Sequence, residues 1–146
     1  MSFASGGGHH RDRTVRRRRL NLMPEQSNIT GLGIILGTTR RDQLVDWYRA
    51  ALEPLGARWQ EHMLVVGDSA IIGFDERDDL ADKAAEPGRH LINITVRDIR
   101  ETERHLNTLG VTWVRPVEDV GGGWFFSTVL DPVGNYLQFL QGPGTP

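Results

Sequence analysis

The chain has 146 residues, of which 38% are hydrophobic and 25% are charged, and its net charge at neutral pH is −2. This length and composition suit one globular domain with its own hydrophobic core. The sequence has no cysteine, which excludes disulfides, thiolate nucleophiles and cysteine-based metal sites, and no apolar run long enough to span a membrane. Since no secretory signal pattern is found either, we expect a cytoplasmic protein.

Charge is distributed unevenly along the chain. Residues 1–22 contain six arginines and one aspartate, a charge of +5, so the remaining chain carries −7. The composition predicts that residues 1–28 are disordered. Either they are a natural tail, or the protein starts at Met23 and the Arg-rich segment is not native. Arginines such as Arg16 to Arg19 can contact phosphates, but the acidic remainder adds no basic surface, so nucleic-acid binding is not expected.

The first predicted elements run from Gly31 to Phe74. A short apolar run at 31–36 predicts a strand. Residues 38–52 have Leu44, Trp47, Tyr48 and Leu52 on one helical face, with Thr39 and Asp42 as the expected N-terminal cap. Three shorter extended stretches follow at 58–60, 63–66 and 70–74, separated by turn residues.

The same order of elements then repeats after a charged linker over residues 75–88. The pattern predicts a strand at 90–96, a helix at 98–109 capped by Asp98 and Glu101, and a helix stop at Gly110. Three more strands are predicted at 111–117, 124–130 and 136–141, with glycine-rich and Asp-Pro loops between them.

A short sequence repeat supports this duplication. The segments LEPLGARW (Leu52 to Trp59) and LNTLGVTW (Leu106 to Trp113) match at both leucines, the glycine and the tryptophan, with a constant offset of 54. We therefore predict a single α+β domain over residues 29–142, made of two βαβββ modules at about 29–75 and 90–142.

These features together resemble a known family. The βαβββ order, the Trp47-Tyr48 pair followed by LEPLG, the VRDI that opens the second helix and the DPVGN turn before the last strand are similar to the vicinal oxygen chelate superfamily. That superfamily includes glyoxalase I, extradiol dioxygenases and bleomycin-resistance proteins. The resemblance implies a curved open mixed sheet around a small-molecule cavity, and in many members a divalent metal. Its members include lyases, oxidoreductases and pure binders, so the resemblance leaves open whether this chain is an enzyme.

The resemblance also indicates where metal ligands would stand. The family positions fall on Gly33, Gly73, Leu91 and Gln138, where a metal needs imidazoles and carboxylates. We therefore predict that the metal site has been lost and expect no cofactor. A one-residue bulge that turns His90 inward would instead give a site from His90 and Gln138, with a divalent metal as cofactor.

Strand alternation predicts the ligand-binding residues. Ile92, Ile94 and Val96 form an apolar face toward the helices, which leaves Leu91, Asn93 and Thr95 facing the cavity. Trp124 and Phe126 share one side of their strand, and Gln138 both donates and accepts hydrogen bonds. Alternatively, Gln138 bonds a neighbour such as Asn93. The predicted ligand site consists of Asn93, Thr95, Trp124, Phe126 and Gln138.

Three functional hypotheses follow from these residues. The first is metal-free binding of a small organic molecule that is partly aromatic or apolar. The second is a metal-dependent glyoxalase-like lyase or dioxygenase that uses His90 and Gln138, and the third is a non-catalytic dimerisation module. We also predict a homodimer, because open strand edges are usually covered and Trp113, Trp124 and Phe126 offer large apolar surfaces.

Overall fold

Each predicted module folds as one strand, one helix and three strands in the computed structural model, which describes residues 28–144. Among the described residues, those from Gly31 onward form one compact unit, and the fold below belongs to it. The predictions made for residues 1–27 lie outside the described residues. Within the described residues, the two mixed four-stranded sheets confirm the predicted α+β class.

The first module contains one parallel and two antiparallel strand pairs. Its sheet, called sheet A here, has the order β1-β4-β3-β2, with β1 parallel to β4. The first strand begins and ends two residues later than predicted, and the last extends two residues further. The elements are β1 (Gly33–Thr38), α1 (Arg41–Leu52), the 3-10 turn η2 (Glu53–Leu55), β2 (Arg58–Gln60), β3 (Met63–Val66) and β4 (Ala70–Glu76).

The second module repeats this topology. Its sheet, called sheet B here, has the order β5-β8-β7-β6, with β5 parallel to β8. The predicted strand at 90–96 is shorter in the structure, while the strand predicted at 111–117 is longer and carries register shifts. The elements are β5 (Ile92–Thr95), α2 (Ile99–Thr108), β6 (Thr112–Gly121), β7 (Trp124–Leu130) and β8 (Tyr136–Gln141).

The two helices begin in different ways. Asp98 caps α2 as predicted, because its side chain accepts the backbone N–H groups of Arg100 and Glu101. The predicted cap of α1 is wrong: the N-cap residue is Arg40, which makes no side-chain cap bond, and the Thr39 hydroxyl instead contacts Asp82. None of the helices in the described chain is both long and apolar enough to cross a membrane.

The sequence repeat marks equivalent structural positions in the two modules. Leu52 and Leu106 are both buried where α1 and α2 end. Gly56 and Gly110 follow with backbone φ angles of +110° and +65°, which favour glycine over residues that carry a Cβ. These paired positions confirm the predicted duplication.

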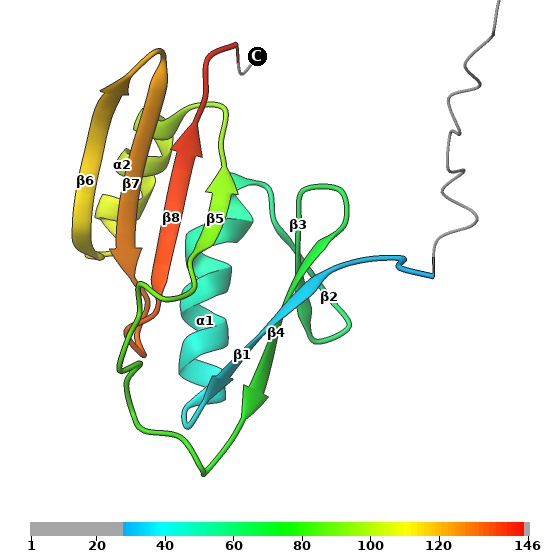
Figure 1. The fold of residues 1–146 in the computed structure, drawn as a ribbon. Helices are drawn as coiled ribbons and strands as arrows, with labels where there is room; N and C mark the ends of the chain where they lie inside the picture. Colours follow the sequence, from blue (N-terminus) through cyan, green and yellow to red (C-terminus); the bar gives the residue numbers. More distant parts are fainter. Residues whose placement is uncertain (1–27, 145–146) are drawn as a thin grey trace, which may run out of the picture. The chain divides into compact units, whose positions relative to one another are not determined.

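Helix α1 belongs to the core of both modules. In Figure 1, α1 lies between the strands of sheet B and those of sheet A, and one cluster of buried residues joins Leu44 and Phe74 to Leu106 and Phe139. Tyr48 of α1 is fully buried, and its hydroxyl donates a 2.9 Å hydrogen bond to Asp131 between β7 and β8. The helix-covered faces of the two sheets therefore share one core, which leaves the opposite face of each sheet open.

Candidate functional site

The open face of sheet B, the side turned away from the helices, carries the predicted ligand residues. Ile92 and Ile94 pack into the core, as predicted, so Asn93 and Thr95 point to the other side. The strand register places a row of polar side chains across this face, from β5 through β8 and β7 to β6. The row consists of Asn93, Gln138, Thr128 and Arg115.

An aromatic stack lies beside this polar row. The rings of Trp124 and Phe126 are nearly parallel, with centroids 6.4 Å apart and an interplanar angle of 24°. The Arg115 guanidinium lies over the Phe126 ring, 5.6 Å from its centroid, and also pairs with Glu118 at 2.7 Å. Trp124 keeps 42% of its surface exposed. The face therefore presents one accessible aromatic ring next to neutral amide and hydroxyl groups and the Arg115–Glu118 ion pair.

Gly142 fixes the position of the Trp124 ring. A Cβ atom built on Gly142 would stand 2.8 Å from the ring, closer than real contacts allow. The indole therefore lies directly against the backbone that follows β8. Sequence analysis missed both Gly142 and Arg115. The contact of Gly142 with Trp124 joins two separate chain segments, and the position of Arg115 over Phe126 depends on register shifts in β6.

The two amides of the polar row are both available to a ligand. Asn93 and Gln138 are directly opposite each other on β5 and β8. Within residues 28–144, no hydrogen bond joins their side chains, and neither amide has another side-chain partner. The structure gives no support to the alternative that Gln138 serves only to satisfy Asn93, because no such bond forms in the single chain.

The positions where the family resemblance would place metal ligands do not suit a metal. Gly33 and Gly73 lie on β1 and β4 and supply no side-chain donor. The Ile35 side chain covers Gly73, with its Cδ1 only 2.5 Å from where a Cβ would be. Leu91 precedes β5, so Gln138 is the only one of the four with a polar side chain. One neutral amide is a poor replacement for the water shell of a divalent cation.

His90 does not join this set. It lies before β5, in a bend, and its side chain is exposed. Its predicted place inside a strand at 90–96 is therefore wrong, because regular pairing with β8 starts only at Ile92. Across residues 28–144, no group of three or more His, Cys, Asp or Glu side chains is arranged to hold a metal.

The titratable groups with shifted pKa values lie away from the open face of sheet B. Burial raises the pKa of Tyr48 well above its usual range, and the charge of Asp131 and the hydrogen bond to it act in the same direction. In the exposed linker, the hydrogen bond from Arg77 lowers the pKa of Asp79. These interactions organise the frame of the protein and the linker and do not add a charge to the candidate site.

The open face is only partly hollowed in the single chain. A cavity of about 400 Å³ between the modules is lined by Asn93 and Thr95, together with apolar residues such as Ile34, Ile71 and Ile94. Trp124, Phe126 and Gln138 do not line that cavity.

Trp113 faces the core and bonds Asn107, so its predicted place with Trp124 on one apolar surface is wrong.

Comparisons with known proteins define the fold. No family model matches the chain, and no curated protein sequence does. Solved structures do match it. TioX from Micromonospora sp. ML1 is 21% identical with a TM-score of 0.59, over 77% of this chain and 96% of that one.

Two further structures have the same arrangement. A glyoxalase/bleomycin resistance protein/dioxygenase from Alicyclobacillus acidocaldarius is 16% identical, with a TM-score of 0.53 over 81% of this chain and 95% of that one. A lactoylglutathione lyase from Agrobacterium tumefaciens is 14% identical, with a TM-score of 0.55 over 80% and 96% of the two chains. At these identities the likeness establishes the fold, and the chemistry must be argued from this chain's own residues.

Proposed function

We propose that this chain, which has the vicinal oxygen chelate fold, binds a small organic molecule with a flat aromatic part on the open face of sheet B. One observation carries the proposal. Trp124 is exposed and stacked on Phe126, beside a row in which the side chains of Asn93 and Gln138 form no hydrogen bond with any of residues 28–144. An aromatic ligand packs on the indole, while the amides bond donors and acceptors along its edge.

Binding without a metal is part of this proposal. It is supported by the donor set, since Gly33, Gly73, Leu91 and Gln138 offer a single neutral amide. The amide serves a ligand better than a cation, because it both donates and accepts hydrogen bonds. A metal-dependent lyase or dioxygenase would need His90 to turn inward from its exposed position before β5.

A homodimer is the second part of the proposal. Binding sites for small molecules usually enclose most of the ligand surface, and the open face alone does not do this. Exposed apolar side chains, among them Ile35, Leu91 and Trp124, border the open faces and strand edges. A second copy that covers sheet B removes this apolar surface from water and completes the walls of the site.

Binding of aromatic compounds is tested with protein labelled with 5-fluorotryptophan. The chain has four tryptophans, and Trp124→Phe identifies the resonance of Trp124. We expect flat aromatic amides to shift this resonance, whereas saturated-ring analogues of the same compounds leave it unchanged. Gln138→Leu should weaken the best compound about five- to tenfold, the effect of one lost hydrogen bond.

Gln60→Leu is the matched control, because Gln60 is an exposed glutamine on β2 of the other sheet. It should leave binding unchanged. A library in which no aromatic compound shifts the Trp124 resonance contradicts the binding proposal and favours a non-catalytic dimerisation module.

The metal is tested by elemental analysis of protein purified without added metal, followed by titration with cobalt and manganese. We expect no stoichiometric metal and no saturable cobalt spectrum. Stoichiometric binding that disappears in His90→Ala would instead establish a site that uses His90.

The dimer is tested by sedimentation equilibrium at micromolar concentration. We expect twice the monomer mass of 16.4 kDa, and dissociation in Trp124→Glu. A single species at the monomer mass refutes this part of the proposal, whereas ligand binding is read separately from the Trp124 resonance.

A further inference from the structure

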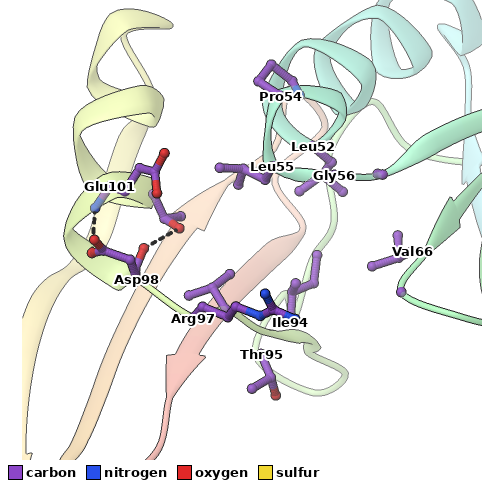
Figure 2. Close-up of a pocket in the computed structure, with 14 residues that line it drawn as sticks. Leu52, Pro54, Leu55, Gly56, Val66, Ile94, Thr95, Arg97, Asp98 and Glu101 are labelled. Carbon is purple, nitrogen blue, oxygen red and sulfur yellow. Dashed lines mark hydrogen bonds between the residues drawn. The ribbon is translucent and has the colours of Figure 1, made fainter. Parts of the chain in front are cut away.

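A second cavity lies at the junction of the two modules, away from the aromatic stack. It has a volume of about 460 Å³, within the range of small-molecule sites, which is roughly 300 to 1,000 Å³. One wall comes from the end of α1 and from η2, and the other from the segment that joins β5 to α2. Figure 2 shows these two walls facing each other, with Val66 at the side.

The α1 wall of this cavity is apolar. It contains no charged side chain, and the neighbouring parts of β3 and β5 add further aliphatic groups. Such a surface favours an occupant with an aliphatic or aromatic body. The apolar side chains of the cavity are those of Leu52, Pro54, Leu55, Ala57, Val66, Ile94 and Val96.

The opposite wall carries charges of both signs. Arg97, Asp98 and Glu101 are the charged residues that line the cavity. In Figure 2 the Arg97 side chain extends beside Ile94, away from Asp98 and Glu101. Within the described residues, neither Arg97 nor Glu101 forms a side-chain hydrogen bond or ion pair. A guanidinium and a carboxylate therefore stand unpaired at separate places around one apolar cavity.

The first backbone N–H groups of α2 are already bonded. The N–H groups of Arg100 and Glu101 bond Oδ1 of Asp98, both at 2.9 Å, and the N–H of Ile99 bonds Oε1 of Gln141 at 2.8 Å. Asp98 is thus engaged in capping α2. Arg97 is left as the group that can receive a carboxylate, and Glu101 as the group that can receive an ammonium.

We infer that this cavity binds an apolar zwitterion, a short apolar peptide with free amino and carboxyl ends. Its carboxylate pairs with Arg97, its ammonium with Glu101, and its side chains pack on Leu52, Leu55 and Val66. A simple anion is repelled by the carboxylates of Asp98 and Glu101, and a simple cation is repelled by the guanidinium of Arg97. Only a molecule with both charges gains at both ends without this repulsion.

The probe is the dipeptide leucyl-leucine, titrated into 15N-labelled full-length protein and followed by amide chemical shifts. We expect saturable shifts at Leu55, Ile94 and Glu101. N-acetyl-leucyl-leucine and leucyl-leucinamide each lack one charge and should bind at least about tenfold more weakly, as should leucyl-leucine to Arg97→Gln or Glu101→Gln.

Arg104→Gln is the matched control, because Arg104 is an exposed arginine on α2 that does not line the cavity. It should bind leucyl-leucine within about twofold of the unaltered protein. The inference is overturned if the dipeptide causes no saturable shifts at the cavity, if the one-charge analogues bind equally well, or if Arg97→Gln leaves affinity unchanged in a protein with an otherwise native spectrum. Failure of this inference is distinguished from failure of the proposed function, because the Trp124 resonance reports the aromatic site of sheet B separately.

Discussion

The two βαβββ modules share a frame and differ in what they place on their open faces. Both end their helices on a buried leucine and a glycine with positive φ. Sheet A then presents glycines and the Ile35 side chain, which is 64% exposed, whereas sheet B presents a stacked aromatic pair and a row of polar groups. Positions that end helices and fill the core are constrained by folding, while open-face positions are free to serve a ligand.

The largest expected effect on stability comes from a turn whose aspartate is buried, whereas the aspartate in the equivalent turn of the other module is exposed. The turn between β7 and β8 holds Asp131, which is buried and accepts bonds from the Tyr48 hydroxyl, the backbone N–H of Val133 and both the backbone and the side chain of Asn135. The corresponding turn between β3 and β4 holds the exposed Asp68. We expect Asp131→Ala to lower the free energy of unfolding by about 3–5 kcal/mol, because four donors lose their acceptor.

Asp68→Ala is the matched control and should change stability by less than about 0.5 kcal/mol. Urea denaturation followed by circular dichroism measures both. Equal effects in the two variants would show that the turns are energetically equivalent.

A smaller effect is expected from Tyr48→Phe, which removes the hydrogen bond between α1 and the second module. The free energy of unfolding at neutral pH should fall by about 1–2 kcal/mol. Because burial raises the pKa of Tyr48, the folded state holds the phenol proton more tightly than the unfolded state.

This difference gives the bond a characteristic pH dependence. The stabilisation is complete below the usual tyrosine pKa of about 10 and is lost as pH rises toward the folded-state value. Unaltered protein should therefore lose more stability than Tyr48→Phe between about pH 9 and 11. This window extends about one unit to either side of the usual tyrosine pKa. Parallel losses would mean that Tyr48 does not govern the alkaline transition.

The shared frame itself is tested by two glycine substitutions. A Cβ on Gly56 or Gly110 would meet no atom within 4 Å, so substitution by alanine measures backbone conformation alone. Gly110 has a φ of +65°, which other residues adopt at some cost, whereas the +110° of Gly56 suits glycine almost exclusively. We expect losses of about 1 kcal/mol for Gly110→Ala and about 2 kcal/mol for Gly56→Ala in thermal unfolding. The reverse order would contradict the assumption that backbone conformation decides the cost.

The smallest effect concerns the hairpin turns. Gly121, which ends β6, and Gly122 and Gly123, which lead to β7, have positive φ angles. In the turn between β2 and β3, Glu61 and His62 have positive φ angles of +46° and +70°. Such turns prefer glycine or asparagine. His62→Gly should therefore raise the free energy of unfolding by about 0.5–1 kcal/mol, as measured by urea denaturation. A lower free energy of unfolding would show that the His62 side chain stabilises the protein by more than its backbone conformation destabilises it.

Sequence patterns were sufficient for most of the secondary structure, because its determinants are local. Alternation of apolar residues, a capping aspartate and a glycine after each helix act over a few positions, so strands 124–130 and 136–141 and the cap at Asp98 were predicted correctly. The same alternation placed Asn93 and Thr95 on one face of their strand and Trp124 and Phe126 on one face of theirs, while the family resemblance indicated Gln138. Errors occurred where local rules compete, as at the start of α1 and around His90.

The contacts around these candidate residues were decided by tertiary structure. Register shifts in β6 set Arg115 over Phe126, and the segment after β8 brings Gly142 against Trp124. The cavity beside Arg97 exists because the end of α1 packs across from the start of α2. Periodicity specifies which face a side chain occupies, but contacts between elements distant in the sequence depend on how whole elements pack. That packing is determined by the shared core, which no local pattern encodes.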